Sequence, residues 1–471
     1  MKKTKIICSI GPSSSNPDTF EKMVLAGCNV ARINFSHATI LERENVVNVV
    51  NEVRKRTNQT IGILYDTKGP EFRNGNVVNG GINLIQGNEI KIVKENVIGN
   101  QEKFSVNHPS AIDSLKVGDT ILLENGLMKI EVIQKGNDFV NCKIITGGIL
   151  ESKKSLSVPG VKLDIPFISK EDYDDIVYAC KNSGNFLACS FVSCKEEVLE
   201  VRKILKEENR EDLKIIAKIE SQTGINNLES IIEVSDGIMV ARGDLGVEIP
   251  MEDLPVCQKK IAELCRKKGK ICIIATEMLE SMKKNIRPTR AEVTDIANAV
   301  YNGADAVMLS GETTTGHYPV EAVSYMAKIC EHIENSNSNR SIFENKIISP
   351  MDAISKSVAN TANDLNAKLI VIPTITGTTA TLVSNLEPNC PILTLTTDKN
   401  VAESLVLNYG IYPKVVNEYK ITEEVFMESR KEALDFMDLY ENDVIIITAG
   451  FNTDINSKEF AKTNLMKIEI I

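Results

Sequence analysis

The residues best suited to chemistry gather in one stretch, residues 215–246, which reads IIAKIESQTGINNLESIIEVSDGIMVARGDLG. Two apolar, strand-like runs flank residues 225–234, whose apolar spacing is typical of a helix. Lys218 and Glu220 end the first run two residues apart, so on a strand they point to the same face. The second run ends in Arg242, Gly243 and Asp244. A strand, a helix and a second parallel strand would bring both polar ends to one edge of a sheet, where they suit a divalent cation and a phosphate.

Either run alone has an ordinary explanation, because a charged residue after an apolar strand usually lies in a solvated loop. The Arg-Gly-Asp triplet is also expected by chance in a chain of 471 residues. The pattern gains weight because polar groups follow six of the eight strands predicted below. Outside the opening stretch these groups are Arg32, Asn34, Ser36 and His37; Asp66, Thr67, Lys68, Glu71 and Arg73; Thr276 and Glu277; and Ser310, Gly311 and Glu312. A single site at one rim explains this recurrence better than unrelated loops.

These side chains indicate the chemistry in outline. Oxygen donors without histidine or cysteine clusters suit Mg²⁺ or Mn²⁺ better than zinc. Phosphoryl transfer requires positioning and positive charge around the migrating group. The cations that offer this charge are Lys68, Arg73, Arg32 and Lys218, while Glu220 and Asp244 offer a metal site. We therefore expect metal-assisted phosphoryl transfer.

Composition excludes several other classes. The net charge of −10 argues against a general nucleic-acid binder. The 11 cysteines include no C-x-x-C pair, which indicates reduced thiols in a cytoplasmic protein. No run approaches membrane-spanning length, so we expect no membrane association.

The elements that must position these residues alternate between strand and helix. Beyond the two runs of the opening stretch, strands are expected at residues 5–10, 30–35, 61–65, 186–192, 271–275 and 306–309. Eight strands alternating with helices predict a (β/α)₈ TIM barrel, and an open doubly wound sheet is the alternative. In such a barrel, catalytic groups lie where strands meet the following loops.

The alternation is interrupted once and then followed by a second unit. Residues 70–160 show the short alternating runs of a small β barrel or sandwich, which we interpret as a lid over the barrel mouth. A polar stretch near residue 340 separates a smaller open α/β sheet. The predicted domains are therefore a barrel of residues 1–69 and 161–340, an inserted β lid of residues 70–160, and a C-terminal α/β domain of residues 341–471.

Several motifs resemble the pyruvate kinase family, and they span nearly the whole chain. They include TKIICSIGPSS, ARINFSHA, YDTKGPEFRNG, IIAKIES, MVARGDLGVEI, ATEMLESM and RPTRAEVTDIANAV. The resemblance implies transfer of the phosphoryl group of phosphoenolpyruvate to ADP, giving pyruvate and ATP in the last step of glycolysis. It also implies allosteric control and a homotetramer.

The resemblance also implies a role for each matching residue. Lys218 would stabilise the phosphoryl transition state and Arg32 would contact the substrate phosphate. Glu220 and Asp244 would bind Mg²⁺ or Mn²⁺, and Gly243, Asp244 and Thr276 would hold the substrate carboxylate. Ser310 and Glu312 would belong to the relay that protonates the enolate. The implied potassium ligands are Asn34, Ser36, Asp66 and Thr67, and the implied nucleotide contacts are Asn34, His37, Arg73 and Lys154.

Some positions bear on regulation and cofactor use. Glu71 is the residue that accompanies potassium dependence in this family, so the resemblance implies activation by K⁺. Glu277 and the lid turn Glu124-Asn125-Gly126 depart from the common pattern. The resemblance also implies a sugar-phosphate effector site in the C-terminal domain, and its candidate phosphate-binding loop is Thr374, Thr376, Gly377, Thr378 and Thr379. However, Thr381 and residues 385–389 lack the basic side chains that related enzymes often have. Fructose 1,6-bisphosphate is therefore a poor expectation, and another effector or none stays open.

Two rival functions remain at this point. One is another metal-dependent barrel enzyme acting on enolates, such as a lyase, which explains the carboxylates but not the lid. The other is a catalytically inactive sensor, which the complete set of Lys218, Glu220 and Asp244 argues against.

Overall fold

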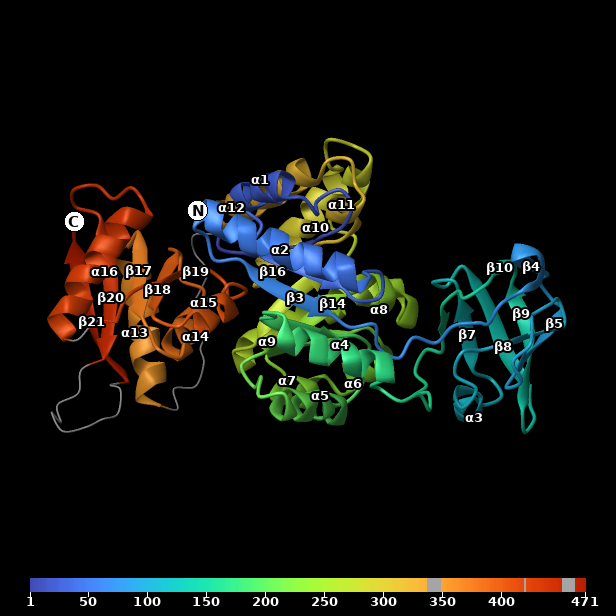
Figure 1. The fold of residues 1–471 in the computed structure, drawn as a ribbon. Helices are drawn as coiled ribbons and strands as arrows, with labels where there is room; N and C mark the ends of the chain where they lie inside the picture. Colours follow the sequence, from blue (N-terminus) through green and yellow to red (C-terminus); the bar gives the residue numbers. More distant parts are fainter. Residues whose placement is uncertain (337–348, 419–420, 451–461) are drawn as a thin grey trace.

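The chain was analysed in a computed structural model that describes residues 1–336, 349–418, 421–450 and 462–471. Figure 1 shows three bodies in a row, with a central barrel between the inserted lid and the C-terminal α/β sheet. The predicted boundary at residue 340 lies outside the described residues.

Eight parallel strands close into a barrel in the order β1-β16-β15-β14-β13-β12-β3-β2. They are β1 (Lys5–Ser9), β2 (Val30–Asn34), β3 (Gly62–Asp66), β12 (Phe186–Cys189), β13 (Lys214–Ile219), β14 (Gly237–Ala241), β15 (Ile271–Ala275) and β16 (Ala306–Leu309). Most strand residues are buried on both faces, which explains their continuous apolar runs. Closure confirms the predicted (β/α)₈ barrel and rules out the open doubly wound sheet.

Helices surround this barrel (Figure 1). They are α1 (Pro17–Ala26), α2 (Ile40–Thr57), α4 (Lys170–Lys181), α5 (Lys195–Glu207), α6 (Gln222–Asn226), α7 (Leu228–Val234), α8 (Arg242–Glu248), α9 (Leu254–Lys268), α10 (Arg290–Tyr301), α11 (Gly311–Thr314) and α12 (Pro319–Ser336), with 3₁₀ turns η2 (Met251–Asp253) and η3 (Glu280–Lys283). Local sequence fixes their ends. Asn16 caps α1 by accepting the Thr19 N–H at 2.9 Å, and Thr289 forms a capping box with Glu292 at the start of α10.

Two predicted elements were wrong in their extent. The single helix expected over residues 225–234 is two helices, because Ser221 caps α6 early and Asn227 leaves helical geometry between α6 and α7. The strand expected over residues 186–192 ends at Cys189, because Phe191 adopts a left-handed backbone with φ +57° and turns the chain.

The lid is an antiparallel-rich β unit that leaves the barrel after β3. Its elements are η1 (Val78–Gly80), β4 (Gly81–Leu84), β5 (Glu89–Val93), β6 (Lys103–Ser105), α3 (Ala111–Ser114), β7 (Thr120–Leu123), β8 (Met128–Lys135), β9 (Phe139–Thr146), β10 (Gly148–Glu151) and β11 (Leu156–Ser157). Strands β11-β7-β8-β9-β5-β6 form one sheet and β10-β4 a second. The lid has its own apolar core, so it can move as a body relative to the barrel.

The C-terminal part is an open sheet with the order β19-β18-β17-β20-β21, in which only β21 runs antiparallel among the described strands. Its elements are α13 (Pro350–Asp364), β17 (Leu369–Pro373), α14 (Thr378–Ser384), β18 (Ile392–Thr396), α15 (Lys399–Ser404), β19 (Ile411–Val415), α16 (Thr422–Phe436), β20 (Val444–Gly450) and β21 (Thr463–Ile470). This arrangement confirms the predicted smaller α/β sheet.

The C-terminal part closes the bottom of the barrel. Val406 and Leu407 are buried in one apolar cluster with inward-facing strand residues such as Val30 and Phe186. A Cβ on Gly62 would lie 2.7 Å from Val406, so glycine is required where the two parts meet. The barrel interior is thus completed by residues from outside the barrel.

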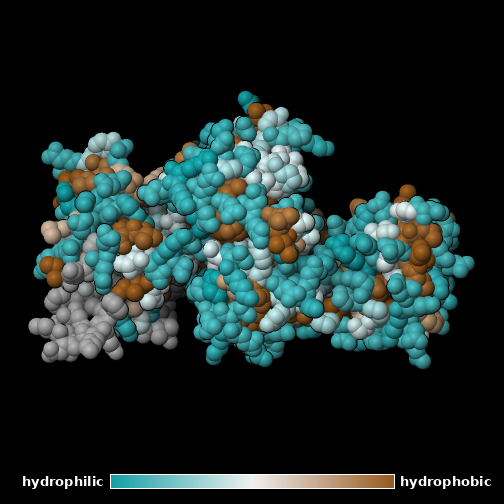
Figure 2. Space-filling model, viewed as in Figure 1, coloured by the Kyte–Doolittle hydropathy of each residue, from teal (hydrophilic) through white to brown (hydrophobic). Residues whose placement is uncertain are grey.

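No described helix is both long enough and apolar enough to cross a membrane. The face of the molecule in Figure 2 is mainly hydrophilic, with small and separate apolar patches.

This packing predicts that Leu407→Ala lowers the free energy of unfolding by about 2–5 kcal/mol, because it leaves a cavity at the base of the barrel. Urea unfolding measures the loss. Leu434→Ala is the control, since Leu434 of α16 is 41% exposed and its truncation should cost about 0.5 kcal/mol or less. Equal effects of the two substitutions would contradict the proposed packing.

Candidate active site

A buried lysine connects the ends of three neighbouring strands. The Lys218 Nζ on β13 lies 3.2 Å from Asp66 Oδ1 at the end of β3 and 3.0 Å from Glu220 Oε1. It also donates to the Ser190 hydroxyl at 2.7 Å, just past β12. Asp66 in turn accepts from Arg32 Nε at 2.7 Å, at the end of β2. Positive and negative groups therefore alternate along the rim.

The pKa values of the side chains in this row of alternating charges are set by burial and by the charged groups next to each of them. Burial alone would lower the pKa of Lys218, but the carboxylates of Asp66 and Glu220 outweigh burial and raise it. Burial would likewise raise the pKa of Asp66, but Lys218 and Arg32 hold it below its usual value. Lys218 is consequently a fixed ammonium at neutral pH, suited to stabilising negative charge rather than to accepting a proton.

Glu220 is the exception in this row. Its carboxylate is only 1% exposed and accepts the Phe191 N–H at 2.6 Å. Burial raises the pKa of Glu220 to about 7; Lys218 opposes the shift, and the nearby Asp244 carboxylate adds to it. Glu220 thus has the Lys218 ammonium on one side and the Asp244 carboxylate nearby, which leaves a local excess of negative charge at this end of the row.

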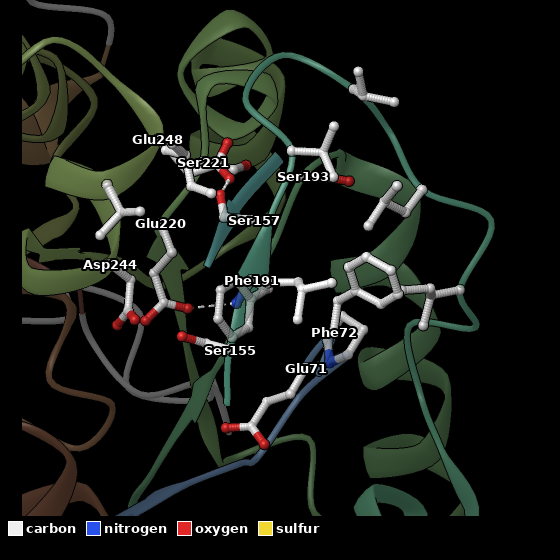
Figure 3. Close-up of a pocket in the computed structure, with 18 of the residues that line it drawn as sticks. Glu71, Phe72, Ser155, Ser157, Phe191, Ser193, Glu220, Ser221, Asp244 and Glu248 are labelled. Atoms are coloured by element: carbon white, nitrogen blue, oxygen red, sulfur yellow. Dashed lines mark hydrogen bonds between the residues drawn. The ribbon is translucent and has the colours of Figure 1, made fainter. Parts of the chain in front are cut away.

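Glu220 and Asp244 lie side by side at one wall of a cavity (Figure 3). The cavity holds about 460 Å³ and lies between the barrel rim and the lid. Among its polar lining residues are Glu71, Arg73, Glu124, Lys154, Ser155 and Ser157 from the lid side and Ser193, Ser221 and Glu248 from the barrel side. Ser157 of the lid donates to Glu248 of α8, the helix that also carries Asp244. The lid therefore contacts the element that supplies one of the two carboxylates.

A divalent cation fits these two carboxylates. The described residues contain no group of three or more histidine, cysteine, aspartate or glutamate side chains that could hold a metal. Two carboxylates with the rest of the coordination supplied by substrate and water is the arrangement that Mg²⁺ commonly adopts. A cation there would also offset the repulsion from Asp244, which adds to the effect of burial on the pKa of Glu220.

The residues expected to hold a carboxylate are joined directly. The Gly243 N–H donates to the Thr276 hydroxyl at 2.9 Å, and that hydroxyl donates to the Ala275 carbonyl at 2.6 Å. Gly243 lies in the first turn of α8 and Thr276 follows β15. The structure thus brings these two residues together at the rim, with Asp244 next in sequence.

Glu312 and Ser310 lie after β16, but the Glu312 carboxylate is engaged with the backbone. It is 1% exposed and accepts the N–H groups of Leu279 at 3.0 Å and Ser310 at 2.8 Å. Burial raises the pKa of Glu312. In this arrangement Glu312 fixes the turn that carries Ser310.

The remaining predicted residues fall into separate groups. Asn34 pairs in register with Asp66 across β2 and β3, and its side chain accepts the Ser36 N–H at 3.1 Å. Thr67 is buried and accepts the Ser190 N–H at 3.2 Å, whereas His37 is exposed. These residues do not line the cavity described above, although they belong to the same rim.

The lid cations pair with carboxylates of the lid side. Arg73 forms a fork with Glu71, with N–O distances of 2.9 and 2.8 Å. Lys154 pairs with Glu124 at 2.6 Å, in the turn that departs from the family pattern, and with Glu151 at 2.9 Å. Both cations line the cavity, on the side opposite the barrel.

The candidate effector loop runs from the end of β17 into the first turn of α14, in the C-terminal part of the chain. Thr374 accepts the Gly377 N–H at 3.0 Å, and the hydroxyls of Thr376 and Thr378 lie 2.9 Å apart. Thr379 is buried, and its hydroxyl lies 2.8 Å from that of Thr463.

The sequence reading missed three contributors. Ser9 of β1 accepts from Arg32 Nη1 at 2.7 Å, Ser190 contacts Lys218, and the Phe191 backbone contacts Glu220. Ser190 directly follows the apolar run of β12, so ending that strand three residues earlier would have revealed it. With these residues, all eight strand ends of the barrel carry polar groups.

Comparisons with known proteins agree with this geometry. The family model "Pyruvate kinase, barrel domain" matches residues 1–323, and "Pyruvate kinase, alpha/beta domain" matches residues 352–469. A pyruvate kinase of Staphylococcus haemolyticus is 43% identical over 100% of this chain and 81% of its own length. One from Geobacillus stearothermophilus is 42% identical over 100% and 80%. A crystal structure of a pyruvate kinase from Cryptosporidium parvum superposes with a TM-score of 0.93 at 37% identity, covering 100% of this chain and 96% of that one.

Fold and site together define a phosphotransferase built on a closed barrel. More narrowly, the chain belongs to the pyruvate kinase family, whose reaction transfers a phosphoryl group from phosphoenolpyruvate to ADP. This assignment sets aside the lyase and the inactive sensor.

Glu220 predicts a pH dependence for metal binding. Without substrate, Mn²⁺ affinity should rise about tenfold per pH unit up to a pH near the Glu220 pKa and then level off, because a protonated carboxyl is a poor ligand. Electron paramagnetic resonance of free Mn²⁺ measures this affinity. Glu220→Gln should bind weakly at every pH, and a wild-type affinity that does not change with pH would contradict the raised pKa.

Proposed function

We propose that phosphoryl transfer takes place at the rim formed by the carboxyl ends of the barrel strands, from β2 through β3, β12, β13, β14 and β15 to β16. Glu220 and Asp244 hold Mg²⁺ or Mn²⁺ there. The observation that carries this proposal is the buried Glu220 carboxylate, which lies 3.0 Å from Lys218 Nζ and beside Asp244 at the cavity wall (Figure 3). When bound, the cation supplies positive charge beside the phosphoryl and enolate oxygens.

Lys218 and Arg32 stabilise the migrating group. Their positive charges come from adjacent parts of the rim and are held in place by the same Asp66 carboxylate. Because both cations are positioned before substrate binds, little reorganisation is needed as negative charge spreads over the phosphoryl oxygens. Asp66 therefore acts by orienting cations.

The substrate carboxylate is held by the Thr276 hydroxyl and the backbone N–H groups of Gly243 and Asp244. The Gly243 N–H donates to the Thr276 hydroxyl at 2.9 Å, so these two groups lie within hydrogen-bonding distance of each other at the rim. Protonation of the enolate is assigned to the Ser310 hydroxyl, with Glu312 fixing its turn through two backbone hydrogen bonds.

Potassium is proposed to bind oxygens at the adjacent ends of β2 and β3, from Asn34, Ser36, Asp66 and Thr67. Asn34 and Asp66 are paired in register there, so an amide oxygen and a carboxylate on adjacent strand ends offer oxygen ligands to the cation. The nucleotide is assigned to Asn34 and His37 on the barrel rim and to Arg73 and Lys154 on the lid side of the cavity.

Further proposals concern the whole chain. The domain limits stay at residues 1–69 with 161–340, 70–160 and 341–471, and the protein is assigned to the cytoplasm. The chain is assigned to a homotetramer, and β21, an edge strand with exposed Leu465, Ile468 and Ile470, offers one surface that a second copy would cover. The loop from Thr374 to Thr379 is assigned to an effector of unspecified chemistry.

The proposed role of Lys218 predicts that Lys218→Met folds but loses turnover by about three orders of magnitude or more, because a fixed transition-state charge is removed. Asp66 keeps Arg32 as a partner, so the fold should survive. Pyruvate formation from phosphoenolpyruvate, with and without ADP, measures the activity. Near wild-type turnover would refute the role, and wild-type pyruvate formation without ADP would refute phosphoryl transfer to ADP.

Glu71→Lys should reduce activation by K⁺, because it places a permanent cation at the position that the family links to potassium dependence. It also removes the carboxylate partner of Arg73. Initial rates with K⁺ and with a large organic monovalent cation measure the activation ratio. Glu102→Lys, an exposed position of the same lid, is the control and should retain the wild-type ratio. An unchanged ratio in Glu71→Lys would contradict the proposal.

A further inference from the structure

The turn after β15 has an unusual backbone. Thr276 has φ +68° and Glu277 has φ +54°, so two consecutive residues that are not glycine adopt the left-handed region. This region is unfavourable for residues with a Cβ and most unfavourable for a β-branched residue such as threonine. Such conformations persist only where the surroundings enforce them, and they concentrate at functional sites.

One arginine holds the peptide between these two residues. Arg242 Nη2 donates to the Thr276 carbonyl at 2.6 Å. This carbonyl is part of the peptide group between Thr276 and Glu277. The backbone angles of these two residues set the orientation of that peptide group. Together with the hydrogen bond from Gly243 to the Thr276 hydroxyl, this contact fixes both polar ends of Thr276.

Arg242 is itself fixed by a second element. It is buried, and its Nη1 donates to both oxygens of Asp295 on α10, at 2.8 and 2.6 Å. Its Nη2 also contacts the Met278 sulfur at 2.8 Å. The guanidinium thus links α8, the turn after β15, and α10 through a rigid planar fork.

We infer that Arg242 and Asp295 are positioning residues that hold the strained Thr276–Glu277 turn in the conformation that receives the substrate carboxylate. The inference rests on the carboxylate role proposed above for Thr276 and Gly243. Arg242 bears on both carboxylate-binding residues. Gly243 follows it directly in the chain, and the Arg242 side chain donates to the Thr276 carbonyl. A lysine could offer charge at this place but not contacts to Asp295 and to the Thr276 carbonyl in a fixed geometry.

Oxalate provides a direct test, because this small dicarboxylate probes the carboxylate site without turnover. Calorimetric titration with oxalate in the presence of Mn²⁺ is expected to show about tenfold weaker binding for Arg242→Lys, because the fork is lost. The KM for phosphoenolpyruvate should rise similarly, and the KM for ADP should change by about twofold or less. Asp295→Asn keeps one acceptor and should shift oxalate affinity in the same direction by about threefold. It serves as the second variant if Arg242→Lys fails to fold.

A rescue variant separates positioning from general loss of stability. Glycine adopts the left-handed region readily, so Glu277→Gly lowers the need for a clamp. Adding it to Arg242→Lys or to Asp295→Asn should recover part of the lost oxalate affinity. The matched control is Arg202→Lys. Arg202 lies on α5 and contacts the residues just before β14, the Val234 carbonyl at 2.8 Å and Asp236 at 2.9 Å, at the end of the strand away from the site. This control should lower the melting temperature but leave oxalate binding unchanged.

The outcomes distinguish this inference from the function on which it rests. Thr276→Val keeps the β-branch and removes the hydroxyl, whereas Thr276→Ser keeps the hydroxyl. If Thr276→Val weakens oxalate and Thr276→Ser does not, the proposed carboxylate role stands. If Arg242→Lys and Asp295→Asn then bind oxalate as the wild type does, or if Glu277→Gly rescues neither, the positioning role is overturned. Wild-type oxalate binding by Thr276→Val would overturn the carboxylate role itself.

Discussion

The structure of the rim depends on the burial of one ammonium group. Lys218 is only 8% exposed, and an unpaired charge at such a position would cost several kcal/mol. Asp66 and Glu220 remove most of that cost, and Asp66 shares its charge with Arg32. When Glu220 is ionised, the row from Arg32 to Glu220 is therefore neutral, with two cations and two anions. Asp244 then adds one negative charge at its end, where a divalent cation and an anionic substrate would together restore balance.

The barrel explains how residues so distant in sequence form this row. Asp66 and Lys218 lie on β3 and β13, which are separated in the sheet only by β12. The lid is inserted between β3 and β12, so both of its connections to the barrel leave from this part of the rim. At the opposite end, Val406 and Leu407 complete the barrel interior. The C-terminal part thus contacts the barrel through packing at this end. Its candidate effector loop belongs to the C-terminal sheet and not to the barrel.

The sequence was sufficient for features that depend on local pattern. Lys218, Glu220 and Thr276 were found because each follows or ends an apolar strand, and closure of the barrel brings such ends together. Phe191 could not be found this way, because its role depends on a left-handed backbone and on an N–H group that every residue type carries. The engagement of Glu312 with two backbone N–H groups is likewise a tertiary feature. The strand pairing of the lid depends on contacts between distant segments, which periodicity alone does not specify.

The cations of the site differ in how firmly they are held, and the difference corresponds to their proposed tasks. Lys218 is buried between two carboxylates, which restrain its position before substrate binds. Lys154 and Arg73 are partly exposed and pair with Glu124 and Glu71 on the lid side. Exposed ion pairs contribute little to stability, so such partners exchange easily for the phosphates of a nucleotide. A rigid charge suits the migrating phosphoryl group, whose geometry is fixed by the reaction, whereas exchangeable charges suit a nucleotide that must enter and leave the site.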